Sequence, residues 1–235
     1  MNRTVGFIYA HPDDETFGCA YLIREIANQG GKPVLLTATR GEAGKSGRLG
    51  PMTREQLAEI RDLELQRAGE ILGIADMERL DMGDGKLQET EQEALVDIIT
   101  AFLNKHGAEV VVTFPADGIS GHPDHIAIHH AVNKAVFSGN CSSVQKLYYN
   151  VMGISGAKAN EEGAAVLELE GEGLQETKAR ALAAHESQIL SIERVFGKLS
   201  EGPPWHFPPE AFQLVWERGS FNPVKRERSI FDDLI

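Results

Sequence analysis

Hydrophobic segments alternate with amphipathic ones from the start of the chain. Residues 4–10 (TVGFIYA) are short, apolar and partly β-branched, which predicts a buried strand. Residues 15–29 carry apolar side chains at near-helical spacing and are followed by Gly30 and Gly31, which predicts a helix that ends there. Residues 33–39 (PVLLTAT) predict a second buried strand. This order of strand, helix and strand indicates a βαβ unit and therefore a parallel sheet.

The same patterns continue along the rest of the chain. They predict further helices at residues 54–72, 90–106, 123–136 and 174–187, and further strands at residues 78–82, 109–114, 146–151, 165–169 and 212–217. Loops are predicted at residues 40–53, 83–87, 115–121 and 202–209. The fold class expected from this order is α/β, with a Rossmann-like, mainly parallel sheet, helices on both faces and an irregular α+β C-terminal part.

The length of 235 residues suits one sizeable domain. We expect a single domain over residues 1–235, with a parallel α/β core at residues 1–140 and a C-terminal extension at residues 141–235. The charged tail from Asn222 onward is expected to wrap loosely around the domain or to make a subunit contact.

The composition argues against several classes of protein. The chain has 23 Lys and Arg against 35 Asp and Glu, and this net charge of −12 argues against nucleic acid or an anionic membrane as a partner. Two cysteines, Cys19 and Cys141, cannot form a disulfide framework. The first apolar run is too short for a signal peptide, and no stretch reaches the ~18 apolar residues of a membrane span. These features predict a cytoplasmic protein with reduced thiols.

Two clusters of polar residues follow predicted strands. HPDDE at residues 11–15 comes directly after the first strand, and GHPDH at residues 121–125 comes after the strand at residues 109–114. Because ligands bind at the carboxyl ends of parallel strands, the two clusters should project to one edge of the sheet. Together they offer imidazoles and carboxylates, and three such ligands with one open position are typical of a catalytic zinc site.

The two clusters also contain more polar groups than a metal needs. A spare carboxylate can take a proton from water, and a spare histidine can protonate a leaving group. Asp13 and Asp14 are adjacent and cannot both point easily at one atom. The simplest interpretation is that one of them is a metal ligand and the other is the base. HPDDE alone could be a turn after a strand with a helix-capping aspartate, and HPDH alone could be a helix that begins with proline and has Asp124 in its first turn. The pairing of the motifs favours a site.

These motifs resemble those of the LmbE-like or PIG-L family of zinc-dependent N-acetylglucosamine deacetylases. Relatives in that family include the bacillithiol- and mycothiol-pathway deacetylases. The resemblance rests on AHPDDE at residues 10–15 and GHPDH at residues 121–125. Weaker matches are TRGEAG at residues 39–44, Asp84 with Gly85, and AHESQ at residues 184–188. Another weak match is Arg61 followed by Glu64 and Leu65, with Leu72 and Gly73 further along the chain.

The resemblance implies hydrolysis of the N-acetyl group of an N-acetylglucosamine-type conjugate, which gives a free amine and acetate. It implies one Zn²⁺ per chain held by His11, Asp14 and His125, although Fe²⁺ or Co²⁺ also suits these ligands. It implies that Asp13 is the general base for the attacking water. It further implies that His122 stabilises the oxyanion and protonates the departing amine.

The resemblance also implies roles for residues that surround the proposed metal ligands. Asp124 would orient His122, as carboxylates often do for histidines. Arg61, Glu42 and Asp84 would contact the substrate. Relatives of this size often form trimers or hexamers, which implies a homo-oligomer. The expected partner is a small N-acetylated sugar conjugate.

Several alternatives stay open at the level of the sequence. The chain could be a metal-dependent amidase or esterase with a non-sugar substrate, or a non-catalytic ligand-binding homologue. A dinucleotide site is disfavoured because the sequence after the first strand lacks the glycine pattern. His129 and His130 are interpreted as ordinary helix histidines, and His185 as either a site-lining or a buried structural residue. The aromatic residue that the family often has near GHPDH is absent from residues 117–120.

Overall fold

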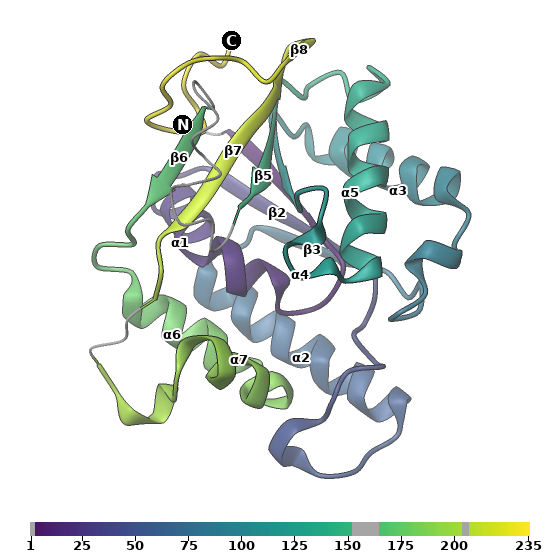
Figure 1. Ribbon diagram of the computed structural model, residues 1–235, viewed down its shortest axis with the longest axis vertical. Helices are drawn as coiled ribbons and strands as arrows, with labels where there is room; N and C mark the ends of the chain where they lie inside the picture. The colour runs from purple at the N-terminus through teal and green to yellow at the C-terminus, as the bar shows by residue number, and fades with distance from the viewer. Residues whose placement is uncertain (1–2, 152–164, 204–206) are drawn as a thin grey trace.

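One continuous sheet forms the centre of the molecule (Figure 1). The computed structural model describes residues 3–151, 165–203 and 207–235. The strands in these parts of the chain are β1 (Thr4–Tyr9), β2 (Lys32–Thr37), β3 (Asp76–Arg79), β4 (Val110–Thr113), β5 (Lys146–Asn150), β6 (Val166–Leu169), β7 (Glu210–Glu217) and β8 (Ser220–Phe221). Their order is β3-β2-β1-β4-β5-β7-β6, with β8 paired to β7. β1 to β5 are parallel, whereas β7 is antiparallel to its neighbours, so the parallel part extends past residue 140 to the end of β5.

Helices cover both faces of this sheet. They are α1 (Asp14–Asn28), α2 (Arg54–Leu72), α3 (Gln92–His106), α4 (Gly118–Gly121), α5 (Pro123–Phe137), α6 (Gln175–Ala184) and α7 (Ile189–Phe196). Short 3₁₀ turns are η1 (Gly47–Leu49), η2 (Leu87–Glu89), η3 (Glu186–Gln188) and η4 (Leu199–Glu201). α1, α2 and α6 pack together on one face, and α3 and α5 pack together on the other (Figure 1). The predicted α/β fold class is confirmed.

Local sequence explains the elements that later position the site. The Thr53 side chain accepts the Gln56 N–H while the Gln56 side chain accepts the Thr53 N–H, and this capping box begins α2. Gly73 ends α2 in the left-handed conformation, at φ 82° and ψ 33°. Every residue of β1 and β4 is buried, as expected for central parallel strands that are covered on both faces.

The helices after β6 differ from the prediction. The helix predicted at residues 174–187 ends at Ala184, because His185 leaves the helical backbone conformation at φ −86° and ψ 61°. The 3₁₀ turn η3 follows, and then α7, which the hydrophobic pattern did not reveal. The chain therefore turns sharply at the AHESQ motif instead of continuing as one helix.

Other differences are small. The strand predicted at residues 78–82 lies at Asp76–Arg79. The loop predicted at residues 115–121 contains the one-turn helix α4, in which Ile119 has a positive φ of 66°. Residues 204–206 of the predicted loop at residues 202–209 lie outside the described residues.

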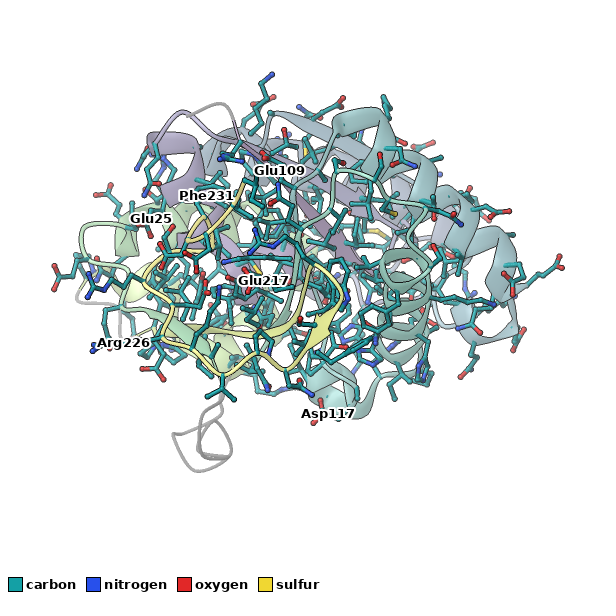
Figure 2. The ribbon with its side chains drawn as sticks, turned by 90° about the horizontal axis from the view of Figure 1, so that it is seen from above. Glu25, Glu109, Asp117, Glu217, Arg226 and Phe231 are labelled. Atoms are coloured by element: carbon teal, nitrogen blue, oxygen red, sulfur yellow. The ribbon has the colours of Figure 1, made fainter. Side chains whose placement is uncertain are left out.

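The prediction of a loosely wrapped tail is wrong. Glu227 is buried, and its carboxylate accepts hydrogen bonds from the Lys146 ammonium at 3.0 Å and from the Tyr148 hydroxyl. Ile230 is buried as well. Lys146 is the first residue of β5, so the tail packs at the end of the sheet where the parallel strands begin. Figure 2 views the molecule from above, with the yellow segment through Phe231 crossing this end.

Glu227→Ala should lower the free energy of unfolding by about 3–5 kcal/mol, because it leaves the Lys146 ammonium buried without its nearest carboxylate. Urea unfolding followed by circular dichroism measures this change. Glu201→Ala is the control, since it removes an exposed ion pair with Lys198 and should cost less than about 1 kcal/mol. Equal and small effects of the two substitutions would contradict a docked tail.

Both cysteines lie in the core as free thiols. Sγ of Cys19 is 2.8 Å from the Tyr9 hydroxyl, and burial raises the pKa of this thiol. Cys19 therefore packs as a small core residue and is a poor nucleophile. Within the described residues, no helix has both the length and the apolar character needed to cross a bilayer.

Candidate metal centre

Two polar loops meet between β1 and β4, at the edge where both strands end. The two strands are parallel neighbours, with Phe7 opposite Val112. β1 leads into the HPDDE motif, and β4 leads through α4 into GHPDH. β2 and β3 lie on the other side of β1, so the order of strands reverses between β1 and β4. Open α/β sheets bind ligands at such a switch point.

Three side chains bring ligand atoms together there. Nδ1 of His11 lies 3.2 Å from Nε2 of His125 and 3.5 Å from Oδ2 of Asp14. The other oxygen of Asp14, Oδ1, lies 3.3 Å from Nε2 of His125. Ligand atoms of a tetrahedral site with bonds of ~2.0–2.1 Å are about 3.3 Å apart. The spacing of these side chains therefore suits a cation of the size of Zn²⁺.

The hydrogen bonds of both rings direct their lone pairs toward this position. Nδ1 of His125 lies 2.9 Å from the Gly118 carbonyl oxygen, so it donates there and leaves Nε2 as an acceptor. Nε2 of His11 lies 3.1 Å from Asp84 and 3.2 Å from Asp124, so it donates to these carboxylates and leaves Nδ1 as an acceptor. Two acceptor nitrogens thus face the Asp14 carboxylate. A shared divalent cation stabilises such an arrangement, and the donor set fits one.

Asp124 contacts a different histidine from the one expected. Its Oδ2 contacts Nε2 of His11, and its carboxylate accepts the N–H groups of Gly85 at 2.7 Å and Leu87 at 3.0 Å. The contact described with His122 comes from the backbone N–H of Asp124, 3.2 Å from Nδ1. The expectation that the Asp124 carboxylate orients His122 is therefore corrected. The loop after β3 fixes this carboxylate on His11, and the sequence does not show that packing.

Asp13 is adjacent to Asp14 in the sequence but makes a different contact. Its Oδ2 pairs with Nη2 of Arg61 at 3.2 Å, and its side chain remains 15% exposed. Burial raises the pKa of Asp13 to about 6, whereas the Arg61 guanidinium acts to lower it. A carboxylate with a pKa near neutrality suits a general base. The geometry is consistent with the division between one base and one ligand.

His122 is the N-cap residue of α5. Its Nδ1 accepts the Asp124 N–H, which leaves the hydrogen of the neutral ring on Nε2. The ring packs edge-to-face on His11, with the centroids 4.7 Å apart. Its nitrogens lie close enough to those of His11 and His125 for a three-histidine site, within 4.8 Å. The capping bond leaves Nε2–H free to donate a hydrogen bond to an oxyanion, and burial together with the neighbouring histidines lowers the pKa of His122, which favours the neutral ring.

Arg61, one of the three residues expected to contact the substrate, is buried at 3% exposure. Its guanidinium donates to the carbonyl oxygen of Gly41 at 2.9 Å and to that of Pro12, besides its pairing with Asp13. These contacts place Arg61 beneath the HPDDE loop. They assign it a part in holding Asp13, while its contact with a substrate stays a prediction.

Glu42 and Asp84, the other two, join neighbouring loops. Glu42 accepts the Asp84 N–H at 2.7 Å, and Asp84 in turn accepts the Ala43 N–H at 2.9 Å. The second oxygen of Asp84 contacts His11. The loops that follow β2 and β3 are thus joined to each other and to His11. Contact of either acid with a substrate also stays a prediction.

The sequence left the AHESQ motif without a role, and the structure brings it to the site. Nε2 of His185 lies 3.1 Å from Oε1 of Glu15, and both side chains are fully buried. The other oxygen of Glu15 accepts the Asp13 N–H at 3.0 Å. His185 is thus a buried residue and not a site-lining one. The motif itself was the signal, but its partner could not be identified before folding.

His129 and His130 lie outside the ligand groups found in the described residues. Nδ1 of His129 lies 2.9 Å from the Phe114 carbonyl oxygen, and its Nε2 is 3.0 Å from Nδ2 of Asn133. His130 is exposed on α5. Both are ordinary helix histidines in this structure, as interpreted from the sequence.

Metal affinity should fall with falling pH, and should begin to fall at a higher pH than ordinary histidine ligands would cause. Burial alone lowers the pKa of His11, but hydrogen bonds to Asp124, Asp14 and Asp84 raise it well above its ordinary value. Below that raised pKa a proton occupies Nδ1 and competes with the metal, and above it Nδ1 is available. Chelator competition between about pH 6 and 8 measures the affinity. An affinity that is constant over this range would contradict the prediction.

Comparison with known proteins finds a family that matches this chain. The profile of the family PIG-L, described as GlcNAc-PI de-N-acetylase, matches residues 7–136. The chain is 28% identical to a 1D-myo-inositol 2-acetamido-2-deoxy-alpha-D-glucopyranoside deacetylase of Kineococcus radiotolerans, over 97% of this chain and 82% of that protein. It is 30% identical to the "Probable N-acetyl-alpha-D-glucosaminyl L-malate deacetylase 2" of Bacillus subtilis, over 83% of this chain and 87% of that protein.

Solved structures share the fold at lower sequence identity. N,N'-diacetylchitobiose deacetylase of Pyrococcus horikoshii superposes with a TM-score of 0.70 at 19% identity, over 99% of this chain and 89% of that chain. The 4-carboxy-2-hydroxymuconate hydratase of Pseudomonas putida superposes with a TM-score of 0.67 at 18% identity, over 94% of this chain and 99% of that chain. The same fold therefore serves more than one reaction, and the function has to be argued from the site.

Proposed function

The chain belongs to the PIG-L family of GlcNAc-PI de-N-acetylases, and from this membership we propose that it hydrolyses the N-acetyl group of an N-acetylglucosamine-type conjugate. One observation carries the proposal: the lone pairs of His11, Asp14 and His125 face one another at the switch point of the sheet. The two curated relatives are named as deacetylases of glucosamine conjugates, one with inositol and one with malate. Their names support the same class of substrate for this chain.

We propose Zn²⁺ as the resident metal, one per chain, held by His11, Asp14 and His125. Two nitrogens and one carboxylate oxygen are common ligands of catalytic zinc, although such a set also accepts Fe²⁺ or Co²⁺. When bound, the cation would supply a Lewis acid for the acetyl carbonyl and lower the pKa of the attacking water to about 7. Asp84 and Asp124 hold the His11 ring in the tautomer that this role requires.

The remaining groups move protons. The Asp13 carboxylate accepts a proton as water adds to the acetyl carbonyl, and Arg61 holds that carboxylate in place. Nε2 of His122 donates a hydrogen bond to the oxyanion. As the C–N bond breaks, the imidazolium form of His122, which carries a second proton on Nδ1 in place of its contact with the Asp124 N–H, gives its Nε2 proton to the departing nitrogen. The products are acetate and a primary amine. The water molecule supplies the oxygen that acetate gains and the hydrogen that the amine gains.

A second candidate is metal-dependent hydrolysis of a non-sugar amide or ester, because the proposed groups would act on any acyl carbonyl and a protein of the same fold is named for a non-sugar substrate. A panel of N-acetylglucosaminides of inositol and malate, an N-acetyl amino acid and an acetyl ester separates the two. We expect primary-amine release from the glucosaminides by the metal-loaded protein, and none after chelation. Turnover of the amino acid or the ester alone would overturn the sugar assignment. No turnover of any member, with the metal bound, would overturn deacetylation of these conjugates.

His122→Ala should lower kcat for an N-acetylglucosaminide by about 10²-fold, because the amine would then depart without a proton donor. The loss should be smaller for an acetyl ester of a phenol, whose leaving group departs as an anion. Metal content should stay at that of the wild type, since Nδ1 of His122 caps α5 and its ring is not among the proposed ligands. Equal losses for amide and ester would contradict the role of proton donor.

A further inference from the structure

Asp13, the proposed base, has an unusual backbone conformation that other residues must hold in place. Asp13 has φ 130° and ψ −27°, a backbone conformation that residues with a side chain rarely adopt. Such a conformation is strained and persists only where surrounding contacts impose it. It also sets the direction of the carboxylate, because the side chain leaves from this backbone. The contacts that impose it therefore matter for a base.

We propose that Glu15 and His185 are positioning residues that fix Asp13 for its role as the base. This inference rests on the proposed function. Oε2 of Glu15 accepts the Asp13 N–H at 3.0 Å, and Oε1 of Glu15 lies 3.1 Å from Nε2 of His185. A chain of two hydrogen bonds thus links the C-terminal AHESQ motif to the backbone of the base, across 170 positions of sequence between Glu15 and His185.

The burial of the pair determines how it acts. The side chains of Glu15 and His185 are both 0% exposed, so neither can touch a substrate. A buried carboxylate needs hydrogen-bond donors, and Glu15 has them in the Asp13 N–H, the His185 ring and the Thr16 hydroxyl. Removal of His185 would leave the carboxylate short of a donor and able to turn away from Asp13. The effect of His185 on the reaction therefore passes through Asp13.

The same motif also contacts α2, the helix that carries Arg61. Ser187 donates to the Glu64 carboxylate from its N–H at 2.7 Å and from its hydroxyl at 2.6 Å. Glu64 lies on α2 three residues after Arg61, and Arg61 holds the Asp13 carboxylate at 3.2 Å. The backbone of Asp13 is thus held by Glu15 and its carboxylate by Arg61, and the AHESQ segment contacts both Glu15 and the turn of α2 that carries Glu64. This arrangement gives a reason for the sharp end of α6 at His185.

The test compares His185→Ala with His185→Gln, whose amide nitrogen can occupy the place of the ring Nε2. We expect kcat to fall about twentyfold or more in His185→Ala, since small misplacements of a catalytic group can cost up to about 10²-fold. His185→Gln should recover most of kcat. KM and the Zn²⁺ dissociation constant should change less than about threefold in both, because neither substrate nor metal touches His185.

Tyr148→Phe is the matched control, since it removes a buried hydrogen bond to Glu227 at the opposite end of the sheet. It should lower thermal stability and leave kcat unchanged. Loss of kcat in proportion to stability in all three variants would show a merely structural role and overturn the inference. So would a His185→Ala enzyme with kcat within about twofold of the wild type.

Amide hydrogen exchange of Asp13, followed by NMR, keeps the inference testable without any substrate. The Asp13 N–H should be protected in the wild type and exchange at least about tenfold faster in Glu15→Gln and in His185→Ala. An unprotected Asp13 N–H in the wild type would overturn the positioning role, whatever the activity. Protection without deacetylase activity would instead count against the proposed function alone.

Discussion

Asp13→Asn is expected to lower kcat by about 10³-fold while one metal ion per chain stays bound. The amide retains the shape of the carboxylate and an oxygen for Arg61, but it cannot accept a proton from water. The three proposed ligand side chains are untouched. Initial rates with the metal-loaded variant and the metal content of the same sample measure both parts of this expectation.

The matched control for this variant is Asp62→Asn. Asp62 also pairs with an arginine, Arg40, but on the partly exposed face of α2. It should keep kcat within about twofold of the wild type, since surface ion pairs contribute little. Loss of the metal from a folded Asp13→Asn protein would show that Asp13 is the ligand and that Asp14 is the base.

His125→Ala is expected to lower Zn²⁺ affinity by more than about 100-fold, beyond the 10- to 100-fold typical of residues that only support a ligand. The substitution removes one of three proposed ligand atoms, and turnover should disappear with the metal. Competition with a chromophoric chelator measures the affinity directly. His130→Ala, on the exposed side of the same helix, should leave the affinity unchanged. Full zinc occupancy in folded His125→Ala would contradict the assignment of His125.

The site could be predicted from the sequence because the carboxyl ends of parallel strands lie at the same edge of a sheet. HPDDE and GHPDH each follow a buried strand, and β1 and β4 are neighbours in the sheet. Pairing of the two motifs could therefore be predicted without knowledge of any distance. The fold class followed from the same alternation of buried strands and amphipathic helices.

Contacts made by loops could not be predicted in this way. Asp124 was expected on His122, but the loop after β3 supplies Gly85 and Leu87 N–H groups that hold its carboxylate on His11. Nothing in the local sequence specifies that approach. The tautomers of His11 and His125 depend on such contacts and are visible only in the folded chain.

Contacts between segments that are distant in the sequence also could not be predicted from local patterns. A charged tail is usually solvated, yet Glu227 forms an ion pair with the buried ammonium of Lys146, which lies 81 positions away in the sequence. The end of α6 was misplaced for a similar reason. Periodicity favours a continuous helix through His185, whereas the buried carboxylate of Glu15 binds the ring of that residue where the helix ends. Tertiary contacts override local propensity at both positions.

The most direct test of metal-dependent deacetylation is a zinc titration of chelator-stripped protein, with primary-amine release from an N-acetylglucosaminide as the readout. We expect no release from the stripped protein, and a rate that rises linearly to about one equivalent of Zn²⁺ per chain and then levels off. Release by the stripped protein at the rate of the loaded protein would contradict the central claim that metal bound by His11, Asp14 and His125 drives deacetylation.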